Sequence, residues 1–374
     1  MDWTAIRAEF PALQTGITHL DTASFGQLPR RTTDAVMRHF AHRDAQGCHD
    51  FLTWFDDLDR TRAAIGELIH ASADQIAFVS NAASALGILL AGIDWRAGDE
   101  VIALEHEFPN NLYAPAFLER RGVIFRECAW PDLDSALNER TRLVLLSTVN
   151  YTTGFRPPIS GLGARLRQRG VLLYVDGTQS VGALRFDIED VQPSMLAVHG
   201  YKWLLCPNGA GFAYVRPEVM NWLEPNVIGW RSHRGWRNVD YLHHGRPELP
   251  PQAEKYEGGM LPFALIYAMD ASVRMMLEIG PELIETRVMQ LAASIRGILT
   301  RAGATAPDHT SQIVTASFPE ADAVELRRAL EQTGVYVSAR RGALRVSAHF
   351  YNDETDLARF EQGLARALTR RRQE

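Results

Sequence analysis

The sequence predicts an α/β protein with a large domain on a mostly parallel sheet and a smaller α+β domain. Three observations carry this prediction. Between about 70 and 215, short apolar runs alternate with helical patterns, which is typical of parallel strands covered on both faces. From about 217 to 260 the chain is irregular, and after Pro262 two long helical patterns precede short strands. We therefore expect a large domain at 15–260 and a small domain formed by 1–14 and 261–374.

In the large domain, apolar and β-branched runs predict strands, and 3.6-residue periodicity predicts the helices between them. The expected strands are 75–79, 100–104, 142–147, 171–175, 195–198 and 211–215, and the expected helices are 82–91, 110–120 and 161–168. In the small domain we expect helices over 263–279 and 281–300, strands over 312–318, 335–338 and 343–348 with a helix between the first two, and a final helix over 354–370.

Composition excludes several classes of protein. The 374 residues are 46% hydrophobic and 22% charged, with a net charge of -6, so the chain is ordinary globular protein without a basic field for nucleic acid. No stretch approaches the roughly 20 apolar residues of a membrane helix, and an acid follows Met1 where a signal peptide would carry positive charge. Three widely spaced cysteines give neither a disulfide framework nor a zinc motif. We expect a cytoplasmic protein without a metal site.

Only two of the 39 basic residues are lysines, Lys202 and Lys255. A guanidinium stays protonated, whereas an amine can lose its proton when it is desolvated and then act as a nucleophile. Lys255 lies in a polar stretch, while Lys202 lies beside apolar residues that would lower its pKa. The rarity of lysine alone leaves two interpretations open: Lys202 has a special role, or it is an ordinary surface lysine.

Three features fall where predicted strands end, and ligands of open parallel sheets bind at that edge. Ala82 and Ala83 begin a helix whose free backbone N–H groups could cradle a phosphate, although an ordinary capped helix has the same pattern. Asp176 follows the strongest strand and could pair with a cationic ring nitrogen or simply form a turn. Lys202 follows 26 residues later. Together they match what pyridoxal phosphate (PLP) needs: a lysine for a Schiff base, an acid for the pyridine nitrogen and a phosphate cradle.

Motifs along the chain resemble one family, the class V aminotransferase group of fold-type I PLP enzymes, which includes cysteine desulfurases, cystine lyase, kynureninase and isopenicillin N epimerase. The motifs occur in one order: 20–24 (LDTAS), 80–84 (SNAAS), 105–113 (EHEFPNNLY), 147–154 (STVNYTTG), 176–182 (DGTQSVG), 199–203 (HGYKW), 209–211 (GAG), 256–259 (YEGG), 344–347 (LRVS) and 351–352 (YN). The resemblance spans residues 20–352 and implies a seven-stranded-type sheet and a homodimer with the active site at the subunit interface.

The resemblance implies a role for each matching residue. Lys202 resembles the Schiff-base lysine, Asp176 the partner of the pyridinium and Gln179 the donor to the ring hydroxyl. Ala82 and Ala83 match the phosphate turn, although the hydroxyl-bearing threonines of the family are missing.

Other positions of the motif are substituted or leave a choice open. His199 and Tyr201 fall where a serine and a histidine often hold the phosphate. Phe108 falls where a ring stacks on the cofactor, with a core aromatic as the plain alternative and His106 as a competing stacker. Asn150 lies near a polar contact of the family, with a register uncertain by one residue.

Arg345 matches the arginine that binds the substrate α-carboxylate, and a guanidinium gives such a group a bidentate grip. A strand-edge surface arginine is the alternative, and Arg340 and Arg341 are nearby competitors. Met260 stands where relatives carry a threonine that contacts phosphate across the dimer. The stretch 229–232 resembles a cystine-lyase segment and is expected at the substrate mouth.

We therefore expect a PLP-dependent enzyme acting on an α-amino acid. A desulfurase needs a cysteine shortly before the carboxylate arginine, and the stretch 335–344 has none. Cys206 is expected to be a buried structural thiol. β-Elimination of the C–S lyase type is the first choice, with transamination and epimerisation next. A binding protein that lost the cofactor and a nucleotide-binding enzyme are the rival classes, the latter without a GxGxxG or GKS/T motif.

Overall fold

A computed structural model of the chain describes residues 1–242, 245–308 and 311–371. Its centre is a seven-stranded sheet with the strand order β2-β8-β7-β6-β5-β3-β4. β8 is antiparallel to both of its neighbours, and every other neighbouring pair is parallel, so the mostly parallel, seven-stranded prediction is confirmed. The strands are β2 (Ile76–Val79), β3 (Glu100–Leu104), β4 (Ile124–Cys128), β5 (Thr141–Ser147), β6 (Leu172–Asp176), β7 (Met195–His199) and β8 (Gly211–Val215).

Both faces of this sheet are buried, which explains why its strands read as continuous apolar runs. On β3, Val101 and Ala103 pack into the core that contains α4 (Ala82–Gly92). Ile102 and Leu104 pack into the opposite core, which contains α3 (Phe51–Ile69), α7 (Leu162–Gln168) and α10 (Phe263–Ile279). Because successive side chains of a strand point to opposite faces, each strand supplies both cores.

Helices cross between the parallel strands close to where they are expected. The three expected helices are α4, α5 (Pro109–Ala116) and α7 (Leu162–Gln168). The short helices α6 (Leu133–Ala136), α8 (Ile188–Val191) and α9 (Pro217–Met220) were not anticipated. The helix expected over 110–120 ends early, and the chain continues as a 3-10 helix over Phe117–Arg121. Pro115 lies in its last turn and has no N–H to donate, which weakens the α-helical pattern there.

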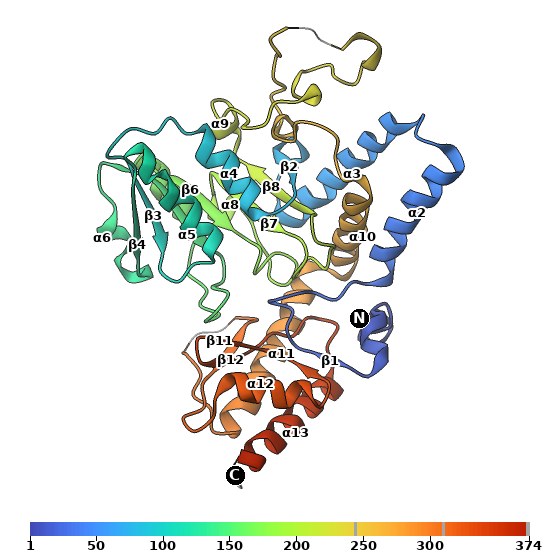
Figure 1. Cartoon of the computed structure of the whole chain (residues 1–374), viewed down its shortest axis with the longest axis vertical. Helices are drawn as coiled ribbons and strands as arrows, with labels where there is room; N and C mark the ends of the chain where they lie inside the picture. Colours follow the sequence, from blue (N-terminus) through green and yellow to red (C-terminus); the bar gives the residue numbers. More distant parts are fainter. Residues whose placement is uncertain (243–244, 309–310, 372–374) are drawn as a thin grey trace.

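Two long helices and one strand were not anticipated. α2 (Arg30–Gln46) and α3 (Phe51–Ile69) both pack against α10 (Phe263–Ile279), and Phe55 and Phe263 meet edge to face there. Figure 1 shows this group beside the sheet. The edge strand β4 was missed because its side chains are largely exposed and form no apolar run.

The small domain forms a third core below the sheet, at the end opposite the irregular segment after α9 (Figure 1). It contains α11 (Pro281–Arg301), α12 (Ala323–Glu331), α13 (Glu354–Arg371) and the sheet β11-β12-β9, formed by Ser338–Arg340, Ala343–Val346 and Val314–Ala316. The strand expected over 335–338 divides, because β10 (Val335–Tyr336) pairs instead with β1 (Thr18–His19). The N-terminal helix is α1 (Trp3–Ala8). The division at residues 14 and 260 stays a prediction.

No helix in the described ranges is long and apolar enough to cross a membrane.

Candidate active site

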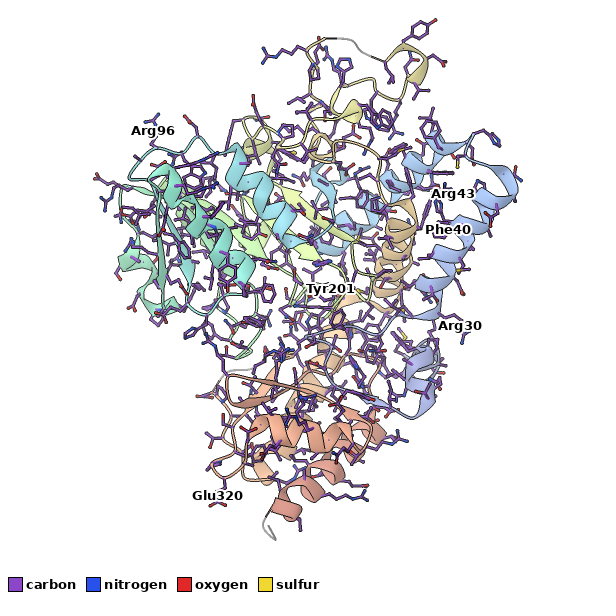
Figure 2. All side chains as sticks on the ribbon, viewed as in Figure 1. Arg30, Phe40, Arg43, Arg96, Tyr201 and Glu320 are labelled. Carbon is purple, nitrogen blue, oxygen red and sulfur yellow. The ribbon has the colours of Figure 1, made fainter. Side chains whose placement is uncertain are left out.

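A cavity lies where β5, β6 and β7 end and α4 begins. Seven of the predicted site residues line it, namely Ala82, Phe108, Asp176, Gln179, His199, Tyr201 and Lys202, together with Asn110, Ser147, Tyr151 and Thr178. Figure 2 labels Tyr201 between the sheet and the small domain. The fold therefore assembles these side chains from segments more than 100 residues apart, at the strand edge that an open parallel sheet offers to ligands.

The loop that carries Lys202 is held tightly from several sides. The Trp203 indole Nε1 donates to Gln179 Oε1 at 2.8 Å, and a His349 ring nitrogen lies 2.9 Å from the Trp203 carbonyl oxygen. Gly26 N donates to the Tyr201 carbonyl at 2.9 Å, and a Cβ at Gly26 would collide with the Lys202 carbonyl. Only glycine allows so close an approach of the two backbones.

The Lys202 amine is buried and faces two rings. Nζ lies 5.4 Å from the Phe108 ring centroid and 5.3 Å from that of Tyr201, and no described residue accepts a hydrogen bond from it. Burial lowers the pKa of Lys202 to about 8; the charge of Asp176 opposes this lowering, and the charge of Arg345 adds to it. Such an amine is partly neutral near pH 8 and can act as a nucleophile or a base.

This burial predicts that Lys202→Met stabilises the cofactor-free protein. Because the pKa in the folded state lies below the ordinary lysine value of 10.5, the charge costs stability in full below about pH 8, and this cost disappears as the pH rises towards 10.5. We expect a gain on the order of 2–3 kcal/mol in the free energy of unfolding at pH 7, shrinking above about pH 8. Urea denaturation over this pH range measures it.

Lys255→Met is the matched control, because Lys255 donates from Nζ to the Met220 carbonyl at 2.6 Å. Losing that hydrogen bond should leave stability unchanged or lower. Equal effects of both substitutions would contradict the assignment of the buried charge to Lys202.

Asp176 ends β6 as a buried acid. Its Oδ1 accepts a hydrogen bond from Thr178 N at 2.9 Å. Burial raises the pKa of Asp176, while Thr178 and the charge of Lys202 oppose the rise. The carboxyl lines the cavity, where it is placed to pair with a cationic nitrogen.

A second buried acid, Glu107, was missed by sequence reasoning. Ser147 N donates to its Oε1 at 2.6 Å, and Asn111 Nδ2 and the Ser147 hydroxyl donate to its Oε2. Burial raises the pKa of Glu107 to about 7, and the charge of Asp176 adds to the rise. The sequence does carry a signal that could have identified Glu107, because it is an acidic residue three positions after the apolar strand β3.

The helix α4 begins at Ala82, which also lines the cavity. The Asn81 side chain caps it by accepting from Ser84 N at 2.9 Å, and the Ala82 and Ala83 amides have no acceptor among the described residues. Ala82 lines the cavity and Ala83 is exposed. A helix start with free N–H groups favours an anion.

His199 offers an independent test of whether PLP suits this cavity. Its Nε2 is buried without a hydrogen-bond partner among the described residues. Burial lowers the pKa of His199 to about 4, and the charge of Lys202 lowers it further, so the ring is neutral. An orphaned ring nitrogen needs a partner. A phosphate supplies one, so the residues fit the group.

Gln179 and Phe108 lie in the cavity as expected. The Gln179 Nε2 donates to the Ala23 carbonyl at 3.0 Å, which leaves one of its two N–H groups for a ligand. Phe108 faces Lys202, while His106 is exposed, has a φ of 65° and does not line the cavity.

Asn150 does not line the cavity, and its neighbour Tyr151 does. The Asn150 Oδ1 accepts from Thr152 N and Thr153 N, both at 3.0 Å, and its Nδ2 donates to the His106 carbonyl at 2.9 Å. These bonds shape the loop after β5. The Asn150 side chain is thus engaged within its own loop, and its role as a cofactor contact stays a prediction.

The arginines of the β11–β12 hairpin differ in burial. Arg345 is 1% exposed, and its Nη2 lies 3.1 Å from Asp21 Oδ1. Burial lowers the pKa of Arg345, and Asp21 opposes this. Arg340 is half-buried, and Arg341 is exposed in the turn. Arg345 does not line the cavity but is near enough to lower the pKa of Lys202.

No residue of the stretch 229–232 lines this cavity within one chain, and its expected place at the substrate mouth stays a prediction. Arg231 is buried and donates to Glu257 Oε2 at 2.9 Å, and its guanidinium lies 4.6 Å from the ring centroids of Phe55 and Trp236. Arg231 thus has a structural role. Met260 is 59% exposed.

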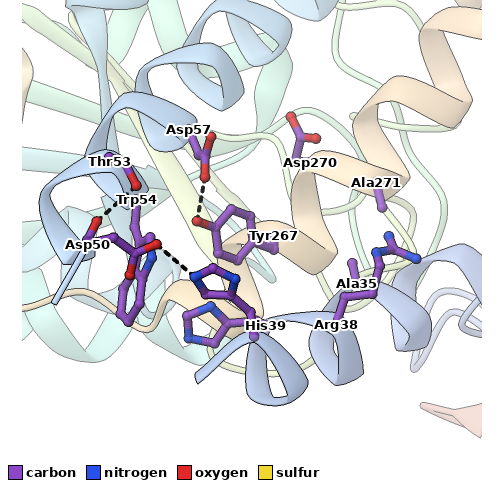
Figure 3. A pocket seen from close by; sticks show the side chains of 11 residues that line it. Ala35, Arg38, His39, Asp50, Thr53, Trp54, Asp57, Tyr267, Asp270 and Ala271 are labelled. Atoms are coloured by element: carbon purple, nitrogen blue, oxygen red, sulfur yellow. Dashed lines mark hydrogen bonds and ion pairs between the residues drawn. The ribbon is translucent and has the colours of Figure 1, made fainter. Parts of the chain in front are cut away.

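A separate cavity lies between α2, α3 and α10 (Figure 3). Its lining includes Asp57, His39 and Tyr267, and the Tyr267 hydroxyl donates to Asp57 Oδ2 at 2.7 Å. None of the predicted site residues lines it. Within the described residues, no group of three or more His, Cys, Asp or Glu side chains could hold a metal ion.

Known proteins resemble the chain over nearly its whole length. Isopenicillin N epimerase of Streptomyces clavuligerus is 27% identical over 389 residues, covering 97% of this chain and 98% of that protein. A probable cysteine desulfurase of Methanothermobacter thermautotrophicus is 25% identical over 385 residues, covering 94% of each. A variant of C-DES with glycine covalently linked to its PLP cofactor has the same fold, with a TM-score of 0.88 at 22% identity, covering 96% of this chain and 98% of that one.

The model of the family described as "Aminotransferase class-V" matches residues 18–360. This range contains the whole cavity, the Lys202 loop and the arginine hairpin. The chain therefore belongs to the class V aminotransferase family.

Proposed function

We propose that the chain is a PLP-dependent enzyme that acts on an α-amino acid. The observation that carries the proposal is the buried Lys202 amine, which has no hydrogen-bond acceptor among the described residues and lies in a cavity that Asp176 and His199 also line. The Nε2 of His199 likewise has no partner in the described part of the chain. The fold shared with PLP-bound C-DES and the relatives named epimerase and desulfurase support it.

Each group of side chains in the cavity has a proposed role toward the cofactor. The Ala82 and Ala83 amides, His199 and Tyr201 bind the phosphate, and Asp176 holds the proton on the ring nitrogen. Gln179 donates to the ring hydroxyl, and Phe108 packs on the ring face. When bound, PLP supplies an electron sink for the electron pair left at the substrate Cα. Lys202 anchors the cofactor, then accepts the α-proton and can return it.

Arg345 is the proposed ligand of the substrate α-carboxylate. It lies on β12 in the small domain, and its guanidinium is oriented by Tyr151 O at 2.6 Å and Ser24 Oγ at 2.6 Å. A side chain held from two sides loses little entropy on binding.

We propose β-elimination of the C–S lyase type as the reaction: the α-proton leaves to Lys202, and the β-substituent departs with its electron pair. Epimerisation is the second candidate, favoured by the likeness to isopenicillin N epimerase, and transamination is a further alternative. A panel of amino acids and cysteine conjugates separates them by scoring pyruvate, ammonia and sulfide against inverted configuration.

The test of the PLP proposal is spectroscopic. Protein supplied with PLP should show a visible absorption band that borohydride bleaches irreversibly. A protein that stays colourless with added PLP would contradict the proposal and favour a binding protein that has lost the cofactor.

Turnover should not need a cysteine. Cys206 is buried, burial raises the pKa of its thiol, and Sγ donates to the Leu204 carbonyl at 3.1 Å. β11 and β12 are joined by only two residues, neither of them a cysteine. We expect a variant with all three cysteines changed to serine or alanine to keep its activity within about twofold, measured as product release. Loss of turnover in Cys206→Ala with the cofactor still bound would restore a thiol-dependent mechanism.

We also propose a homodimer with the active site at the subunit interface. One chain leaves apolar side chains exposed on α2 and in the segment after α9, among them Met37 at 66%, Val227 at 56% and Met260 at 59%. Sedimentation at micromolar concentration should give twice the chain mass of 41.8 kDa. A cytoplasmic location stays a prediction.

A further inference from the structure

Two arginines share one face of the β11–β12 hairpin. Ser338 lies opposite Arg345 in the antiparallel register, and Arg345 Nε donates to Ser338 Oγ at 3.0 Å. Arg340 lies two residues beyond Ser338, so it points to the same face. The two guanidiniums meet at Ser24 Oγ, to which Arg345 Nη2 donates at 2.6 Å and Arg340 Nη2 at 3.4 Å.

Their positive charge is only half compensated. Asp21 Oδ1 lies 3.1 Å from Arg345 Nη2, whereas no carboxylate of a described residue lies within 4.0 Å of Arg340. The turn residue Arg341 adds a further exposed cation. The hairpin therefore presents excess positive charge beside the cavity.

The two side chains also differ in free donors. A guanidinium has five N–H donors. Arg345 uses four, toward Ser338, Tyr151, Asp21 and Ser24. Arg340 uses two, toward Ala339 O at 2.9 Å and Ser24. Arg340 thus keeps three donors, arranged in a planar fork that suits a carboxylate.

The two arginines, Arg345 and Arg340, differ in how deeply they are buried beside the cavity. Arg345 Nη1 donates to the carbonyl of Tyr151, a residue that lines the cavity, whereas Arg340 is connected to this group through Ser24 Oγ. Arg345 is nearly fully buried, and Arg340 is half-buried nearer the hairpin turn. Because both guanidiniums donate to Ser24 Oγ, a ligand bound at Arg345 would lie beside Arg340.

From this arrangement we propose that the substrate is an α-amino acid whose side chain ends in a carboxylate, and that Arg340 binds that distal carboxylate. The proposal rests on the proposed PLP function and on Arg345 as the ligand of the α-carboxylate. It narrows the substrate class to dicarboxylic amino acids and carboxylate-ended cysteine conjugates.

The experiment compares amino acids that differ only in the distal group. PLP-loaded protein is titrated with glutamate against glutamine, and with S-carboxymethylcysteine against its side-chain amide, and the shift of the visible band gives each dissociation constant. At least one carboxylate should bind about 10- to 100-fold more tightly than its amide, as expected for a charge-assisted hydrogen bond. In Arg340→Gln this preference should vanish while the affinity for the amide stays unchanged.

Arg341→Gln is the matched control, because that side chain is exposed in the turn, and it should keep most of the preference. Three results would overturn the proposal: equal affinities within each pair for the unchanged protein, no binding by any carboxylate member, or equal weakening of both members in Arg340→Gln, which would make Arg340 the α-carboxylate ligand. A missing visible band would refute the PLP function itself, and this inference with it. A normal visible band together with equal affinities for the carboxylate and the amide of each pair would refute only the inference about Arg340.

Discussion

Lys202→Ala is expected to abolish both the borohydride-sensitive band and turnover. Lys202 is the only lysine at the cavity, and Lys255 is committed to the Met220 carbonyl elsewhere. Loss of a positioned base alone costs roughly 10²–10⁴-fold in rate, and loss of the covalent anchor adds to this. The measurement is the visible spectrum of protein dialysed against PLP without amino acids, followed by borohydride and an activity assay.

Lys255→Ala should keep the band and the activity, which controls for the loss of a buried amine. A Lys202→Ala protein that still fixes PLP on borohydride treatment would assign the covalent anchor to another group. The circular dichroism of the Lys202→Ala variant should match that of the unchanged protein, because the loop that carries residue 202 is held by Trp203 and Gly26 rather than by the amine.

Asp176→Asn is expected to lower kcat/KM by roughly 10²–10⁴-fold, comparable to the loss of an acid–base group. The asparagine can still accept the Thr178 N–H bond, so the fold is retained while the negative charge is lost. Steady-state kinetics on the substrate identified by the panel measure this change, with PLP content determined separately.

The same substitution has a second readout that a structural role would not move. Since Asp176 raises the pKa of Lys202, its removal should shift that pKa below about 8. The pH midpoint for acylation of Lys202 in the cofactor-free protein should fall accordingly. Asp187→Asn, near the surface beside His70, is the control and should shift neither quantity. An unchanged midpoint with normal turnover would remove Asp176 from the proposed mechanism.

Local patterns predicted much of the fold because the local and tertiary signals agree. Strands such as β5 and β6 are buried on both faces, so their apolar runs are unambiguous, and α10 and α11 appear within two residues of their expected bounds. The sequence did not predict β4, because this edge strand buries little of its side chains and carries no apolar run. α2 has few buried residues on its own, and its place depends on α10, more than 200 residues away.

The sequence by itself determined six strands of the seven-stranded sheet, the family resemblance and the chemically distinctive residues Lys202, Asp176 and Arg345, because residue type and strand-end position are local properties. Only the tertiary structure decided which side chains face the cavity. It placed Tyr151 there instead of Asn150, Phe108 instead of His106, and Arg231 in a structural ion pair. It also revealed the burial that lowers the pKa of Lys202 and the unequal compensation of Arg340 and Arg345. Desolvation and charge pairing depend on neighbours brought together across the whole chain, and no local pattern encodes those distances.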